Sequence, residues 1–131
     1  DIFCGLPWTF LDKDISAKNR RVLYGGAGAH RPKPYGVEYR TLSNCWLRSP
    51  LYTKLTYKLI RDALQFTKSH PEPDSFKELP TTEVIEAINA SNKRLAARLF
   101  TNLAWPYLAR DTKRLFKLVN QGVNQAFLEN W

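Results

Sequence analysis

Apolar residues recur at helical spacing through the second half of the chain, directly after Ser49 and Pro50. Serine at an N-cap, followed by proline in the first turn, is a typical helix start, so we expect a helix from Pro50 to about Lys68. The apolar face of this predicted helix comprises Leu51, Leu55, Leu59, Ala63 and Phe66.

Three shorter helices are predicted beyond the prolines at positions 71, 73 and 80, which bracket a loop. We expect these helices to begin at Thr81, at Ser91 or Asn92, and at Asp111, which would cap the last of them. Their expected inward residues are Val84, Ile85 and Ile88; Leu95, Leu99 and Leu103; and Leu115, Val119, Val123, Phe127 and Trp131. We interpret the last stripe as core packing rather than as a groove for a partner.

The first half of the chain predicts shorter elements. Residues 2–11 are apolar and are interpreted as the end of a helix. Residues 15–23 predict a short basic helix that ends at Gly25 and Gly26, because glycine commonly terminates helices.

Two prolines within residues 25–35 exclude a helix there, so we expect a loop, followed by a strand over residues 36–47. Together with the helices, this strand predicts an α+β chain whose helices lie mostly on one side of a small antiparallel sheet. If the other strands of that sheet lie outside this chain, the predicted strand has an unpaired edge, and we expect homo-oligomers.

The composition fits a single domain of 131 residues, in which residues 1–50 differ in character from a helical tail over 51–131. Hydrophobic residues make up 44% of the chain, which is enough for a core and excludes wholesale disorder. No apolar stretch reaches the roughly 18 residues of a membrane-spanning helix, so no membrane association is expected. The chain contains no methionine, even at position 1, and we therefore expect it to be part of a longer protein.

The two cysteines, Cys4 and Cys45, match no metal-ligand spacing. We expect two free thiols in a reducing cytoplasm, and a disulfide between them is the alternative. The first residues lack a basic leader followed by an apolar run, so no secretory signal is predicted and we expect a cytoplasmic location.

Positive charge is concentrated in one third of the chain. Residues 13–61 hold 11 lysine and arginine residues but only two acidic residues, Asp14 and Glu38, which gives this stretch a net charge of +9. The formal net charge of the whole chain is +8, so the remaining residues are close to neutral. A field this concentrated attracts an anionic ligand.

The candidate chemistry lies within this basic stretch. The glycines beginning at Gly25 allow backbone N–H groups to approach a ligand, and Arg31 and Lys33 follow next to two prolines. On a strand, Glu38 and Arg40 project from the same side. A carboxylate beside several cations can hold Mg²⁺ together with a phosphate. The plainer alternatives are a simple glycine turn and a structural ion pair between Glu38 and Arg40.

The run from Leu23 to Leu47 resembles a signature of the phage carboxylate–amine ligases of the COOH–NH2 ligase type 2 family, also called amidoligases. The resemblance rests on Leu-Tyr-Gly at 23–25, Ala-Gly-Ala at 27–29, Arg-Pro-Lys-Pro-Tyr-Gly-Val-Glu-Tyr-Arg-Thr-Leu-Ser-Asn at 31–44, and Trp-Leu at 46–47. The first residues of the chain and Ala-Ile-Asn-Ala at 87–90 also resemble the family.

The resemblance implies a fold similar to that of glutamine synthetase and glutamate–cysteine ligase, in which a strand carries glutamate, any residue, arginine. It implies that Glu38 is a Mg²⁺ ligand at the nucleotide phosphates. It implies two catalytic residues, of which Arg40 binds the transferring phosphate or the activated carboxylate and Arg31 is a second phosphate contact. Further ATP or substrate contacts that it implies are Lys33, Tyr35, Ser43 and Asn44. It also implies an N-terminal portion, with a His-x-His motif and more acidic ligands, that this sequence does not contain.

The activity implied by the resemblance is ATP-dependent amide or peptide bond formation through an acyl phosphate. The substrates would be a small-molecule or peptide carboxylate and an amine, in the host cytoplasm if a phage encodes the protein. One alternative is a nucleic-acid-binding module, in which tyrosines stack on bases between the basic residues. Glu38 counts against nucleic acid as a partner, because a carboxylate repels a phosphate backbone. The other alternative is a non-catalytic remnant.

Overall fold

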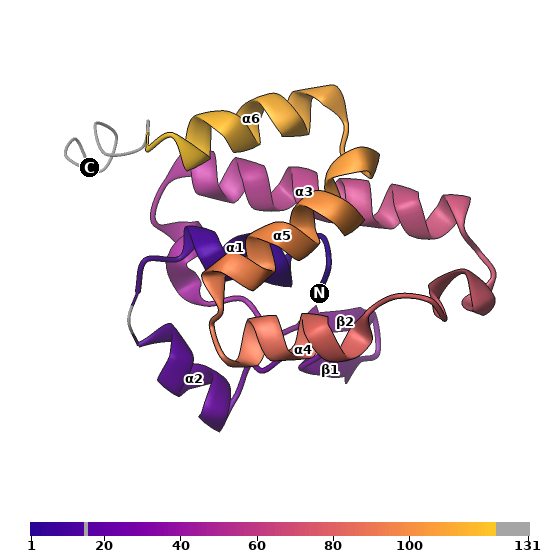
Figure 1. Ribbon diagram of the computed structural model, residues 1–131, viewed down its shortest axis with the longest axis horizontal. Helices are drawn as coiled ribbons and strands as arrows, with labels where there is room; N and C mark the ends of the chain where they lie inside the picture. The colour runs from indigo at the N-terminus through magenta and orange to yellow at the C-terminus, as the bar shows by residue number, and fades with distance from the viewer. Residues whose placement is uncertain (15, 123–131) are drawn as a thin grey trace.

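The computed structural model describes residues 1–14 and 16–122, which form a mainly helical α+β structure with one small sheet (Figure 1). The helices are α1 (Gly5–Leu11), α2 (Ala17–Leu23), α3 (Pro50–Ser69), α4 (Thr81–Asn89), α5 (Lys93–Leu103) and α6 (Arg110–Asn120). The strands are β1 (His30–Lys33) and β2 (Gly36–Tyr39), which pair as an antiparallel hairpin. Short 3-10 helices lie at η1 (Asn44–Leu47), η2 (Pro73–Phe76) and η3 (Trp105–Tyr107).

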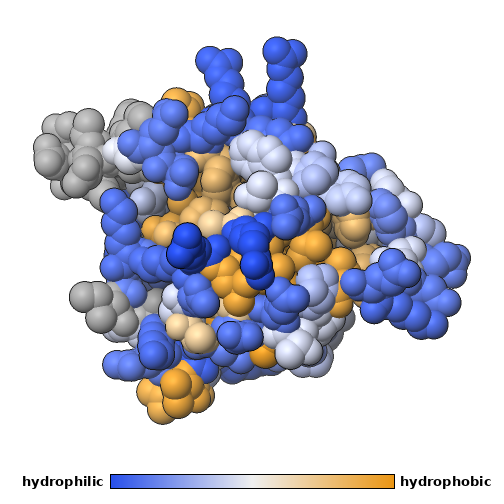
Figure 2. All heavy atoms as spheres, in the orientation of Figure 1, coloured by the Kyte–Doolittle hydropathy of each residue, from blue (hydrophilic) through white to orange (hydrophobic). Residues whose placement is uncertain are grey.

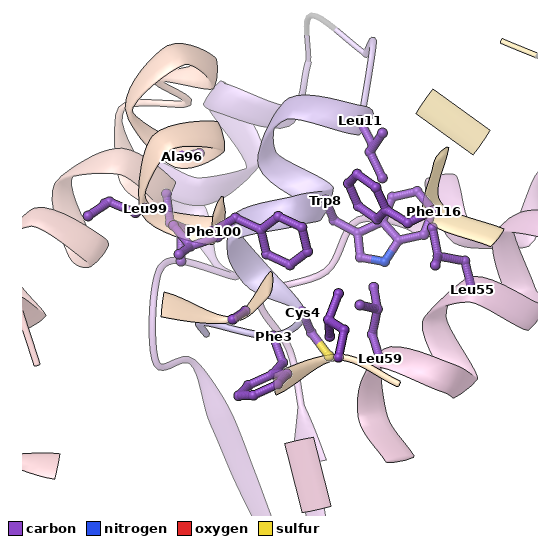
Figure 3. Packing of buried hydrophobic residues seen from close by; sticks show 14 of the residues in the cluster. Phe3, Cys4, Trp8, Leu11, Leu55, Leu59, Ala96, Leu99, Phe100 and Phe116 are labelled. Carbon is purple, nitrogen blue, oxygen red and sulfur yellow. The ribbon is translucent and has the colours of Figure 1, made fainter. Parts of the chain in front are cut away.

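The apolar run at the start of the chain forms the centre of the core. Trp8 of α1 is buried, and side chains from α3, α5 and α6 surround it (Figure 3). Its ring packs edge-on against Tyr52, with the ring centroids 5.2 Å apart. The neighbouring Phe10 ring lies 5.9 Å from the rings of Phe100 and Phe116. Helices that are distant in sequence are therefore held together around α1.

The surface is mostly hydrophilic on the face drawn in Figure 2, with apolar residues exposed over α2 and within a hollow at the centre. Val22 and Leu23 at the end of α2 are among the most exposed large hydrophobic residues. None of the described helices is both long and apolar enough to cross a bilayer.

Two of the predicted helix starts are confirmed by their caps. The Ser49 hydroxyl accepts a hydrogen bond from the Tyr52 backbone N–H at 3.2 Å, and the Asn92 side chain accepts one from the Leu95 N–H at 3.1 Å. The predicted inward face of α3 is also confirmed, because Leu55 has no exposed surface and its neighbours on that face are buried or half-buried.

Two details of the helical prediction are wrong. Ile85 is 43% exposed, because Ala87 occupies the inward position between Val84 and Ile88 on α4. Asp111 lies in the first turn of α6 and is not its cap, since the helix is preceded by Ala109. The inward positions predicted at Val123, Phe127 and Trp131 lie outside the described residues.

The prediction for the hairpin region is wrong in part. Residues 25–35 are not all loop, because β1 forms within them despite Pro32. A proline is tolerated there because no described strand pairs with the outer side of β1. The strand predicted over 36–47 ends at Tyr39, and η1 follows where the strand was expected to continue.

Within the described residues, both outer edges of the two-stranded sheet are without a neighbouring strand. Pro32 lacks an N–H and therefore blunts the β1 edge, whereas β2 contains no proline. The edge of β2 is the one better suited to pairing, and homo-oligomer formation stays a prediction.

A charged network fixes the start of α6 against α3. The buried Asp62 carboxylate accepts a hydrogen bond from the Ala109 backbone N–H at 2.9 Å and two from Arg61, at 3.0 and 3.2 Å. Arg61 also donates to Asp111 at 3.1 Å, and Lys58 donates to the other oxygen of that carboxylate. Asp111 therefore bonds to α3 rather than capping its own helix.

We expect Asp62→Ala to lower the free energy of unfolding by about 1–3 kcal/mol, because it leaves the Ala109 N–H without its acceptor. Urea denaturation followed by circular dichroism measures this. Asp74→Ala is the matched control, since this exposed aspartate pairs with Lys77 one turn away and its removal should cost less than about 0.5 kcal/mol. Equal losses in the two variants would contradict the role given to Asp62.

The same network predicts that the free energy of unfolding depends on pH. Hydrogen bonds from Lys58 and Arg61 hold the pKa of Asp111 below its usual value. Such a group stabilises the fold above its unfolded pKa of about 4, and this contribution is lost as the pH falls through the folded pKa. We expect the free energy of unfolding to decrease below about pH 4, and to decrease less in Asp111→Asn. A pH series of denaturation curves tests this, and an equally steep decrease in the variant would argue against it.

Both cysteines are free and buried, which confirms the expected thiols. Burial raises the pKa of the Cys4 thiol to about 11 and that of the Cys45 thiol to about 12. Because the thiolate is the reactive form, both groups are inert near neutral pH in the folded protein.

We therefore expect a thiol reagent to label the native chain slowly and to label both cysteines once urea unfolds it. Mass spectrometry after timed labelling counts the modified thiols. Rapid native labelling of either cysteine would contradict the burial of that side chain.

Candidate functional site

The hairpin brings the predicted charged residues to one face. Its register places Arg31 opposite Glu38. Lys33 lies two residues after Arg31, and Arg40 lies two residues after Glu38, so strand alternation directs all four side chains to the same side. The Arg40 backbone N–H donates to the Ala29 carbonyl at 2.8 Å, which extends the pairing past the end of β2.

Three cations converge on the single carboxylate. Glu38 Oε2 lies 3.7 Å from Arg31 Nη1 and 3.5 Å from Lys33 Nζ, and Glu38 Oε1 lies 3.5 Å from Arg40 Nε. The Glu38 side chain is 41% exposed, so the cluster is open to solvent rather than sealed in the core. The three cations exceed the one anion by two charges, and an incoming phosphate or carboxylate would relieve their mutual repulsion.

Arg20 of α2 positions this cluster, and the sequence analysis missed it. Arg20 Nη2 donates to the carbonyls of Arg40 at 2.9 Å and Leu42 at 2.7 Å, and Nη1 donates to that of Thr41 at 3.2 Å. The Tyr24 ring lies 4.7 Å from the Arg20 guanidinium carbon and 4.5 Å from that of Arg40. Arg20, and to a lesser extent Arg40, lowers the pKa of the Tyr24 phenol through hydrogen bonding and charge. The one available sequence signal was the i,i+4 spacing of Arg20 and Tyr24.

The glycine loop acts as a turn that makes room for Arg20. Gly25 has a positive φ of 90°, and a Cβ there would lie 2.5 Å from the Arg20 guanidinium, so only glycine fits. The Ala27 backbone N–H donates to Asn89 of α4 at 2.8 Å, and Thr41 donates to the Gly26 carbonyl at 2.9 Å. These contacts favour the simple-turn interpretation over a phosphate cradle. They also account for Asn89 in the Ala-Ile-Asn-Ala segment.

Three other predicted contacts lie in different surroundings. Tyr35 is at the tip of the hairpin and is 88% exposed. The Ser43 hydroxyl donates to the buried Asp12 carboxylate and accepts from the Cys45 N–H, so it fixes the chain locally. Asn44 is exposed and lines a cleft that lies next to the charged cluster. Of these three, only Asn44 is placed to meet a ligand in that cleft.

A cleft of about 750 Å³ opens between the hairpin, α3 and the first residues of the chain. Glu38 and Arg40 lie at its edge together with Arg20, Tyr24 and Asn44. Arg31 and Lys33 contact Glu38 but do not line the cleft itself. The candidate site therefore consists of a cationic cluster with a cavity on one side of it.

Glu38 is the single carboxylate of the charged cluster. The Glu38 carboxylate is engaged by three cations, and residues 1–14 and 16–122 contain no group of three His, Cys, Asp or Glu side chains able to hold a metal. Because Mg²⁺ takes six oxygen ligands, phosphate and water oxygens would have to supply most of its shell.

The family of the chain follows from comparison with known proteins. No curated protein and no solved structure matches the chain, so the glutamine synthetase-like fold stays a prediction. The family described as phage phiEco32-like COOH.NH2 ligase-type 2 matches residues 1–122, which include the charged hairpin and helices α1 to α6. The chain therefore belongs to this family of carboxylate–amine ligases.

Proposed function

We propose that the chain contributes to an ATP-dependent ligase that forms an amide or peptide bond through an acyl phosphate. A carboxylate oxygen of one substrate attacks the γ-phosphorus of ATP, the bond from that phosphorus to the bridging oxygen breaks, and ADP leaves. The nitrogen of an amine then attacks the acyl carbon, the carbon–oxygen bond to phosphate breaks, and phosphate and a proton are released. Both substrates are small molecules or peptides.

The observation that carries this proposal is the convergence of three cations on Glu38 at the edge of an open cleft. Phosphoryl transfer depends mainly on positioning and on neutralising the charge of the transferred group. Arg40 lies at the cleft and is held by the Arg20 contacts to the backbone, so it is the best placed to meet that group. Arg31 and Lys33 add charge from the outer side of the cluster.

Mg²⁺ is proposed to accompany ATP, as the resemblance implies, with phosphate and water oxygens as its main ligands. Glu38 is the one protein contact proposed for it. The proposed roles of the chain's own residues are to bind the phosphates and to orient the carboxylate.

We expect Arg40→Ala to lower the rate of ATP-dependent product formation by about 10²–10³-fold in the complete enzyme, because it removes a cation from the transferring phosphate. Glu38→Gln should also abolish most turnover, since it removes the one carboxylate proposed to contact Mg²⁺. Release of ADP and formation of the amide product are measured together. The melting temperature of each variant, from circular dichroism, shows whether it remains folded.

Arg48→Ala is the matched control, because Arg48 forms one exposed ion pair with Asp14 and does not line the cleft. Its turnover should stay within about twofold of that of the unmodified enzyme. Near-normal ATP consumption by a folded Arg40→Ala enzyme would overturn the site assignment. Salt-dependent binding of mixed-sequence oligonucleotides, without ADP formation, would instead support the nucleic-acid alternative.

A further inference from the structure

The cleft beside the charged cluster has two chemically different parts. One part holds the two guanidinium groups of Arg20 and Arg40, which lie 4.7 and 4.5 Å from the centre of the Tyr24 ring. The rest of the cleft is mainly apolar. Its large apolar residues from α3 and the segments around it are Tyr57, Ile60, Leu64, Phe66, Phe76 and Leu79.

The α3 wall of this cleft is an apolar face that residues 1–14 and 16–122 leave largely exposed. Tyr57, Ile60 and Leu64 are spaced so that they share one side of the helix, and they are 76%, 43% and 59% exposed. Leu55 and Leu59 on the other side of α3 are fully buried in the core. Single exposed apolar residues are common, but a contiguous apolar face beside a cationic group marks a binding surface.

Two carboxylates also line the cleft, and both have partners. Glu38 is held by its three cations, and the Asp1 carboxylate accepts a hydrogen bond from the Tyr39 hydroxyl. Arg20 uses its donors on backbone carbonyls, so its contribution to a ligand is charge rather than hydrogen bonds. Arg40 is therefore the group in the charged part of the cleft that is suited to hold an anionic head.

We propose that this cleft binds the carboxylate substrate, and that the substrate carries an apolar aliphatic or aromatic body. Its carboxylate lies at Arg40, and its apolar part lies against Tyr57, Ile60 and Leu64. The inference rests on the proposed function and adds to it the class of acid that the ligase activates. The volume of about 750 Å³ falls within the range of small-molecule sites and favours such a ligand over a protein segment.

The test measures binding to the full chain without ATP, by two-dimensional NMR titration. Acetate, butanoate, hexanoate and 3-phenylpropanoate are the carboxylate probes, 1-hexanol is the neutral analogue, and ADP is titrated separately. We expect affinity to rise by about fourfold for each methylene that is buried, as transfer free energies predict. Hexanol should bind about tenfold more weakly than hexanoate, and the shifted amide signals should be those of α3 and β2.

Two isoleucines provide a matched pair of variants. Ile60 lines the cleft and Ile85 lies on α4 outside it, and both are 43% exposed, so neither substitution by serine should unfold the chain. Ile60→Ser should lower the affinity for hexanoate by about fivefold or more and leave the affinity for acetate unchanged. Ile85→Ser should leave both affinities within about twofold of those of the unmodified chain. Arg40→Gln should lower the affinity for hexanoate to that for hexanol and leave the affinity for hexanol unchanged.

Equal affinity for acetate and hexanoate, or equal losses in the two isoleucine variants, would overturn the proposal. So would a titration in which ADP, but no carboxylate, shifts the α3 signals, because the apolar wall would then hold a nucleotide base. If the complete enzyme turns over a polar acid while no apolar acid binds, this inference fails and the proposed function stands. If apolar acids bind as expected but ATP is never consumed, the binding site stands and the proposed function fails.

Discussion

Hydrogen bonds from one guanidinium to three successive backbone carbonyls hold the candidate site together. The chain that leaves β2 has no neighbouring strand to pair with in the described structure, so its carbonyls need another donor. Arg20 supplies the donors for the carbonyls of residues 40–42. The Tyr24 ring packs against both Arg20 and the Arg40 side chain. The charged cluster of the hairpin therefore depends on a helix that contributes no atom to it.

The helices were predictable from the sequence because the information for them is local. Ser49 and Asn92 cap helices within three residues of the N–H groups they bind, and the apolar stripe of α3 repeats within a single helix. The hairpin was less predictable, because β1 forms around Pro32 through pairing with β2, and β2 ends where Arg20 takes over its carbonyls. Arg20 lies 20 residues before Arg40 in the sequence, so its contact with that carbonyl leaves no local pattern.

The residues of the candidate site were also predictable only where the information for them is local. Strand alternation was enough to place Glu38 and Arg40 on one face, and the basic residues next to the two prolines already added Arg31 and Lys33 to the set. The hydrogen bond from Ser43 to Asp12 could not be predicted from the neighbours of Ser43, because Asp12 lies in another segment. The apolar wall of the cleft could not be predicted from the sequence either, since the sequence shows an amphipathic helix but not which of its exposed residues border a cavity.

The hydrogen bonds described between the hairpin region and other segments lie near its base, where Arg20, Asn89, Thr41 and Asp1 take part, whereas Tyr35 at the far end is 88% exposed. Because no such hydrogen bond reaches the far end among the described residues, the shape of the hairpin near its turn rests on the pairing of its own two strands. Lys33, next to the turn, is held mainly by its ion pair with Glu38, whereas Arg40 has both that carboxylate and the anchored backbone to hold it.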